Sequence, residues 1–134
     1  MGAWGVGVFE NDTACDYVAE IAETTSTTKL EATLDRILTA GGSSPESPEC
    51  EEALAAADII ARLKGSFGDR TAYTKEIDKW VERVKLVPSD ALVEKARRTV
   101  TRIMTGPAEL HDLWSESGEL ESWKSSLEGV LRRL

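Results

Sequence analysis

The sequence contains little histidine and little cysteine. Among its 134 residues there is one histidine, His111, and there are two cysteines, Cys15 and Cys50. One histidine cannot form a histidine-rich metal site, and two cysteines are too few for the disulfide framework of a small secreted domain. We therefore expect two reduced core thiols, no metal site, no cofactor and no catalytic residues.

Long apolar runs, phosphate-binding signatures and an excess of basic residues are also missing. No apolar stretch reaches the roughly 18 residues that span a bilayer, and no secretory signal opens the chain. Gly5-Val6-Gly7 begins like a dinucleotide fingerprint, but Glu10 stands at the third glycine position. Acidic residues outnumber basic ones by 24 to 16, which disfavours nucleic acid as a partner. These absences predict a cytoplasmic protein that binds neither membranes nor nucleic acid.

Helical periodicity is what the sequence has in abundance. Ala14, Tyr17, Val18 and Ile21 follow the spacing of one helix face, and similar stripes recur along the chain between turn residues such as Gly106-Pro107. The alanine-rich segment 48–64 has apolar residues on more than one face, which is typical of a buried helix. We predict a single all-α domain over residues 1–134. It is a compact bundle of six to seven short helices with a glycine-rich N-terminal arm, residues 1–10.

Acidic residues are concentrated in the first half of the chain. Residues 1–60 contain 12 acidic residues and only two basic ones, Lys29 and Arg36. Asp12, Asp16 and Glu20 are spaced four apart, so they share one face of the first predicted helix, and Glu23 follows them. Such carboxylates either bind a cation or point into water, and we expect water because no second ligand set accompanies them. This acidic face is our candidate partner-binding surface.

Basic residues gather in the predicted helix after Pro88. Lys95, Arg97, Arg98 and Arg102 lie there without the interleaved aromatic side chains of a nucleic-acid reader. We expect Glu94 to pair with Arg98 at i, i+4, and the remaining cations to contact solvent or the acidic first half of the chain.

The opening segment Gly2-Ala3-Trp4-Gly5-Val6-Gly7-Val8-Phe9-Glu10-Asn11-Asp12 resembles the start of a bacterial family called domain of unknown function 4259. Later segments are similar too, among them Trp80-Val81 and residues 109–116, whereas Tyr17 stands where the family pattern leads us to expect Trp. The resemblance implies a small bacterial cytosolic protein and assigns no activity. We expect Trp4 and Phe9 to anchor the arm, and Asn11 and Asp12 to cap the first helix.

Three functions fit these features, and the favoured one is not enzymatic. The first is an acidic protein-binding module, of the immunity type that sequesters a basic bacterial toxin, with Asp12, Asp16, Glu20 and Glu23 as the binding face. Such a module can be a monomer or a homodimer. The second function is a structural or regulatory subunit that forms a homodimer. The third is a metal-dependent hydrolase that uses Asp12, Asp16 and Glu20.

Overall fold

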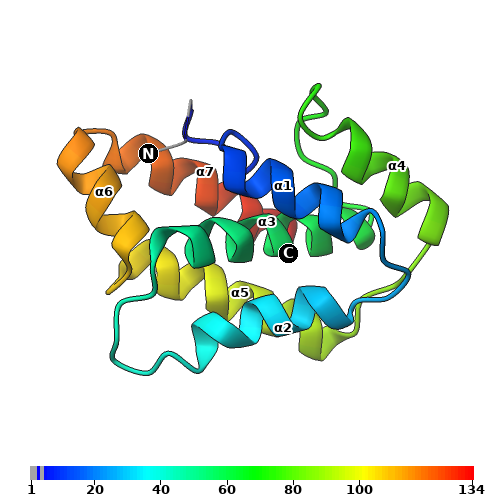
Figure 1. Cartoon of the computed structure of the whole chain (residues 1–134), viewed down its shortest axis with the longest axis horizontal. Helices are drawn as coiled ribbons and strands as arrows, with labels where there is room; N and C mark the ends of the chain where they lie inside the picture. Colours follow the sequence, from blue (N-terminus) through cyan, green and yellow to red (C-terminus); the bar gives the residue numbers. More distant parts are fainter. Residues whose placement is uncertain (1–2, 4) are drawn as a thin grey trace.

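The computed structural model describes residue 3 and residues 5–134, and this part of the chain contains seven α-helices and no strand (Figure 1). The helices are α1 (Asp12–Ile21), α2 (Thr28–Leu38), α3 (Ser47–Leu63), α4 (Lys75–Val84), α5 (Asp90–Thr105), α6 (Glu109–Ser117) and α7 (Leu120–Arg133). The all-α prediction is confirmed. Within the same part, no helix has both the length and the apolar character needed to cross a membrane.

Helix α3 is the centre of the fold. It packs against each of the other six helices, with α1 on one side and α2 and α5 on the other (Figure 1). Its alanines make this possible, because small side chains let neighbouring helices approach closely while long ones fill the gaps between them. From Ala53 to Leu63 every residue of α3 is buried. The prediction that the alanine-rich segment is the buried helix is therefore confirmed.

Three tryptophans fill the core. Trp80 is fully buried, and Trp114 and Trp123 nearly so. The indole nitrogen of Trp80 donates a 2.8 Å hydrogen bond to the carbonyl of Thr24, which satisfies the one polar atom of that side chain. The expectation that Trp4 anchors the arm concerns a residue outside the described part of the chain.

The N-terminal arm turns back on itself before α1 begins. Ala3 forms a single antiparallel β-bridge with Asn11. The Asn11 side chain then caps α1, its Oδ1 accepting a 2.7 Å hydrogen bond from the amide of Ala14. The expectation that Asp12 also caps the helix is wrong, because Asp12 is the first helical residue and its exposed side chain makes no capping bond.

Two glycines of the arm make room for one carboxylate. Glu10 accepts a 3.0 Å hydrogen bond from the amide of Gly7. A Cβ added at Gly7 would stand 2.5 Å from Oε1 of Glu10, and one added at Gly5 would also collide with this carboxylate. The glycines are therefore needed because the Glu10 side chain folds over the backbone of its own turn.

Helix α5 is tied to α2 by ion pairs. Nζ of Lys95 lies 2.8 Å from Glu31 and 2.9 Å from Asp35, and the hydrogen bond to Glu31 is the main cause that raises the Lys95 pKa. Docking of this basic helix against the acidic first half is thus present in the structure. The predicted Glu94–Arg98 pair is wrong, because Glu94 pairs with Arg97 at i, i+3 instead.

Candidate functional site

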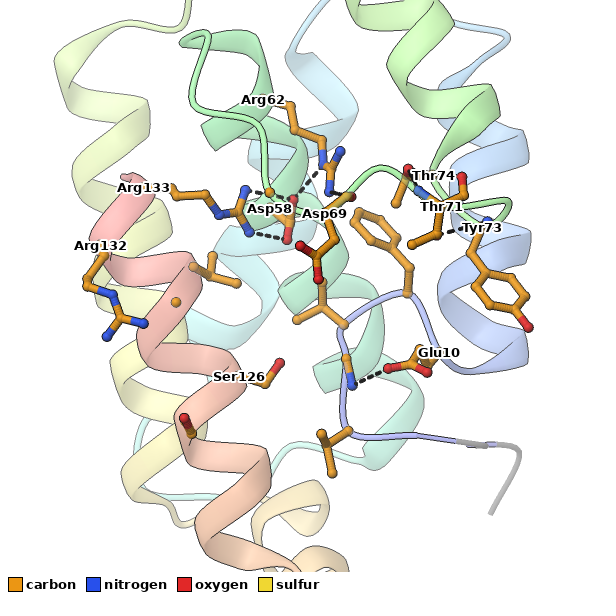
Figure 2. Close-up of a pocket in the computed structure, with 18 of the residues that line it drawn as sticks. Glu10, Asp58, Arg62, Asp69, Thr71, Tyr73, Thr74, Ser126, Arg132 and Arg133 are labelled. Atoms are coloured by element: carbon orange, nitrogen blue, oxygen red, sulfur yellow. Dashed lines mark hydrogen bonds and ion pairs between the residues drawn. The ribbon is translucent and has the colours of Figure 1, made fainter.

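A polar groove of about 740 Å³ lies between three segments that are distant in sequence (Figure 2). Its walls are the N-terminal arm, the loop 64–74 between α3 and α4, and one side of α7. The volume falls within the range of about 300–1,000 Å³ that is usual for ligand pockets. The residues with polar side chains along it are Glu10, Asp58, Arg62, Asp69, Thr71, Tyr73, Thr74, Ser122, Ser125, Ser126, Arg132 and Arg133.

The inner end of the groove is closed by a two-point ion pair between α3 and α7. Nη2 of Arg133 lies 2.6 Å from Oδ2 of Asp58, and Nη1 lies 3.2 Å from Oδ1 (Figure 2). Nη1 also donates a 3.1 Å hydrogen bond to the carbonyl of Ser66 in the loop 64–74. Gly68 allows this approach, because a Cβ there would stand 2.8 Å from the guanidinium carbon of Arg133.

Arg62 is the most buried cation of the site and uses every nitrogen of its guanidinium. Nε lies 2.7 Å from Asp58, Nη1 lies 2.7 Å from Asp78, and Nη2 donates a 3.0 Å bond to the carbonyl of Asp69. Phe9 covers one part of the group, with its ring centroid 5.3 Å from the guanidinium carbon. The residue is only 2% exposed, so these bonds are what makes its burial tolerable.

Asp58, Arg62, Asp78 and Arg133 form what we call the ion network. Its two carboxylates balance its two guanidinium groups, and Thr74 donates a 3.0 Å hydrogen bond to the remaining oxygen of Asp78. The network is therefore neutral as a unit, with its charged atoms bound to one another. Its residues lie on α3, α4 and α7, and its guanidinium groups bind carbonyl groups of the loop 64–74. The network therefore sets the shape of the groove, and binding of a ligand depends on other side chains.

Two further carboxylates along the groove lie outside the ion network. The Asp69 carboxylate makes no hydrogen bond or ion pair among the described residues, and Glu10 uses one oxygen for Gly7. Figure 2 shows Asp69 between α7 and the arm, with Ser126 on the facing side of α7 and Glu10 on the other side of the arm. Arg132 lies at the outer margin of the same view. The groove thus offers free acceptors at two separate points.

The acidic face expected from the sequence lies on the outside of α1. Asp12, Asp16, Glu20 and Glu23 are all exposed. Glu20 pairs with Lys29 at 2.9 Å, and both side chains are largely exposed. Within residues 3 and 5–134, no group of three or more histidine, cysteine, aspartate or glutamate side chains could hold a metal ion.

The two cysteines and His111 lie apart from the groove. Burial raises the pKa of Cys50 to about 12, and burial together with Asp12 raises the pKa of Cys15. Both thiols are free in the structure, and a raised pKa disfavours the reactive thiolate. His111 packs edge-on against Trp123 at 6.2 Å between ring centroids.

A buried carboxyl, Glu51, lies beneath the arm. It is 7% exposed and faces a small space lined by Gly5, Leu54 and Trp114, among others. Burial raises its pKa, while a hydrogen bond from the Thr13 side chain acts in the opposite direction. The neutral, protonated form of Glu51 is therefore favoured more in the folded chain than in water.

Sequence reasoning missed the ion network. The available signal was weak: Asp58 and Arg62 stand four residues apart inside an alanine-rich helix that was expected to be buried. Charged residues in a fully buried helix need partners, since an unpaired buried charge is very costly. Those partners come from α4 and α7, and the spacing within α3 does not indicate which residues they are.

Comparison with known proteins identifies the family of this fold. No curated protein and no solved structure matches the chain. One family model matches residues 2–126, a range that includes the arm, the loop 64–74 and the part of α7 that carries Ser122, Ser125 and Ser126. The chain therefore belongs to the family described as Domain of unknown function (DUF4259).

Proposed function

We propose that this protein is a binding module for a basic partner protein. The observation that carries the proposal is the distribution of free carboxylates. Helix α1 contains three acidic residues, contains no basic residue and exposes all three of those side chains. Glu10, which directly precedes the N-cap of α1, lines the polar groove. A partner that contacts both would meet Asp12 and Asp16, which have no internal ion pair among the described residues, and the second oxygen of Glu10.

The contrast with α2 supports this assignment. Glu31 and Asp35 are also acidic and partly exposed, but both bind Lys95 of the same chain. Within the described residues Asp12, Asp16 and Glu23 have no such internal partner. Their charges are therefore available to another molecule, and clustered charges of one sign increase the rate at which an oppositely charged partner associates.

An immunity-type role is the specific form of the proposal. Toxins that act on nucleic acid are basic because they bind phosphates. A small acidic protein that covers such a surface blocks the toxin and binds it rapidly through complementary charge. The net charge of −8 and the acidic first half of the chain fit this role.

The two other functions have less support from the geometry. A homodimer formed through an apolar surface requires exposed hydrophobic side chains, and the large ones in the described part are Tyr73 and Val87. A metal-dependent hydrolase using Asp12, Asp16 and Glu20 requires these carboxylates to converge. On α1 they are exposed side by side along the helix.

The test compares two variants of equal charge. The first neutralises the α1 face with Asp12→Asn, Asp16→Asn, Glu20→Gln and Glu23→Gln. The second neutralises four exposed glutamates elsewhere, at Glu116, Glu119, Glu121 and Glu128. The product of the gene adjacent to this one is the candidate partner, and its affinity is measured by calorimetry at low and at physiological salt.

We expect the α1 variant to bind at least tenfold more weakly than the original chain, with a larger loss at low salt than at physiological salt. The control variant is expected to bind within about threefold of the original, because a change in net charge alone acts weakly at physiological salt. Equal weakening by both variants, or a neighbouring product that forms no complex, would contradict the proposal.

A further inference from the structure

Unlike the acidic face of α1, the groove has a wall, the loop 64–74, whose backbone is hydrogen-bonded to buried side chains of the ion network. The Asp69 carbonyl is fixed by Arg62, and the Ser66 carbonyl is fixed by Arg133. The loop 64–74 is therefore held at two points by the buried ion network. Preorganisation of this kind lowers the entropic cost of binding, since the loop does not need to be ordered when a ligand arrives.

The charges that remain in the groove have a definite sign. Arg62 and Arg133 are neutralised by Asp58 and Asp78. Among the other charged side chains that line the groove, Glu10 and Asp69 are acidic and Arg132 is basic. Both Asp69 and Arg132 are exposed. Figure 2 shows them on opposite sides of α7, with Asp69 on the side that faces the arm. The charges outside the ion network therefore leave the groove with an excess of acidic groups, which favours cations and hydrogen-bond donors.

The walls favour an extended segment over a compact small molecule. Ser122, Ser125 and Ser126 supply hydroxyl groups along α7, with Gly129 one turn further on, while Val6 and Phe9 supply apolar surface from the arm. The hydroxyl groups can hydrogen-bond the N–H and C=O groups of an extended peptide, while the apolar wall can contact the carbon chains of its side chains. Of the two carboxylates, Asp69 lies between α7 and the arm, and Glu10 lies beyond the arm with one oxygen bound to Gly7.

We infer that the groove binds an extended, basic segment of the partner protein, with Asp69 and Glu10 each accepting hydrogen bonds from an arginine or lysine side chain. This inference rests on the proposed function and specifies the partner's anchor. The groove provides charge-assisted hydrogen bonds at fixed positions, and these give specificity. The acidic face of α1 provides the longer-range attraction.

The test uses a defined peptide, acetyl-Gly-Arg-Gly-Arg-Gly-amide, titrated into the ¹⁵N-labelled full chain. The same peptide with citrulline in place of arginine keeps the shape and removes the charge. The protein variants are Asp69→Asn and Glu10→Gln. Neither removes a structural bond, because Asp69 binds Arg62 through its backbone carbonyl and a glutamine at position 10 still accepts from the Gly7 amide.

We expect amide shifts at Gly68 and Gly129, which line the groove. Asp69→Asn and Glu10→Gln should each weaken binding about fivefold to tenfold, because the amide keeps an acceptor oxygen and removes only the charge that strengthens the hydrogen bond. The citrulline peptide should bind at least tenfold more weakly. Arg132→Met should strengthen binding about twofold, since Arg132 is the cation outside the ion network among the described residues that line the groove, and it repels the peptide.

Failure of this inference is distinguishable from failure of the proposed function. If peptide binding falls with the neutralised α1 face but not with Asp69→Asn or Glu10→Gln, the groove is not the anchor, although the acidic face still binds basic partners. If Asp69→Asn strengthens binding, or if Arg132→Met weakens it, the groove selects anions and the inference is overturned. Binding that responds to neither set of variants contradicts both proposals.

Discussion

Asp58 in the middle of α3 and Arg133 at the end of α7 form a two-point ion pair across 75 positions of sequence, with contacts of 2.6 and 3.2 Å. Asp58 is almost completely buried, whereas the Arg133 side chain is 21% exposed. The pair thus joins the central helix to the last one at the inner end of the groove.

Replacement of Arg133 by methionine should destabilise the fold by about 2–3 kcal/mol. The change leaves the buried Asp58 carboxylate with only Arg62 as its partner. Removal of one member of a buried ion pair destabilises a protein more than replacement of both members by apolar residues, because the remaining charge is not compensated. The partial exposure of Arg133 keeps the loss below the value for a fully buried pair. Urea unfolding followed by circular dichroism measures the change.

The adjacent arginine offers a matched control for that experiment. Arg132 is exposed and makes no ion pair among the described residues. Arg132→Met should therefore change the free energy of unfolding by no more than about 0.5 kcal/mol. Equal losses for the two variants would show that the Asp58–Arg133 pair does not stabilise the protein.

Asn11→Ala should cost about 1 kcal/mol of stability, because it removes the side chain that caps α1. Asp12→Asn, one residue further on, should cost less than half as much, since Asp12 acts only through its charge near the helix N-terminus. Thermal and urea unfolding of the two variants separate these roles. A larger loss for Asp12→Asn would restore the capping role first expected for that residue.

The turn of the arm predicts an energetic coupling between Gly7 and Glu10. Gly7→Ala places a methyl group against the Glu10 carboxylate and disturbs its bond to the Gly7 amide. In a Glu10→Ala background the same substitution meets no carboxylate, so it should cost about 1 kcal/mol less. A double-mutant cycle with urea unfolding measures this coupling, and additive effects would contradict it.

Glu51→Gln should stabilise the protein more at pH 7 than at pH 4. Burial raises the pKa of Glu51 above its ordinary value of 4.5. The folded state therefore favours the protonated form of Glu51. As the pH rises, this carboxyl ionises at a cost to the folded state, so its contribution to the free energy of unfolding becomes less favourable. Glutamine remains neutral at every pH and can still accept the bond from Thr13.

The difference in unfolding free energy between Glu51→Gln and the original chain, measured at both pH values, checks this prediction. Comparison with the original chain cancels the titration of all other groups. Exposed Glu128→Gln controls for the change in net charge. A difference that stays constant between pH 4 and pH 7 would show that burial of Glu51 does not affect its titration.

Local patterns were sufficient for most of the architecture. The spacing of Ala14, Tyr17, Val18 and Ile21 predicted α1, and all four side chains are buried. The alanine-rich segment predicted the central helix, and the opening motif indicated the family that the matching model shows. These features depend on residues a few positions apart, where helix periodicity and capping operate.

The partners of individual polar side chains, in ion pairs and in helix caps, were predicted less well. Glu94 binds Arg97 rather than Arg98, and Asn11 alone caps α1. Arg97 and Arg98 are adjacent, and pairing of Glu94 with one or the other differs by little in energy, since exposed helix ion pairs contribute only a few tenths of a kcal/mol. Small differences in side-chain direction decide such cases.

By itself the sequence determined the helices, the buried faces and the acidic first half, because each follows from residue type and local spacing. Only the tertiary structure decided that Asp58 meets Arg133, that Arg62 meets Asp78, and that Asp69 is left free in a groove beside them. The physical reason is that a charge finds its partner through the packing of whole helices. The contacts between α3, α4 and α7 that bring these groups together are not encoded in any one segment.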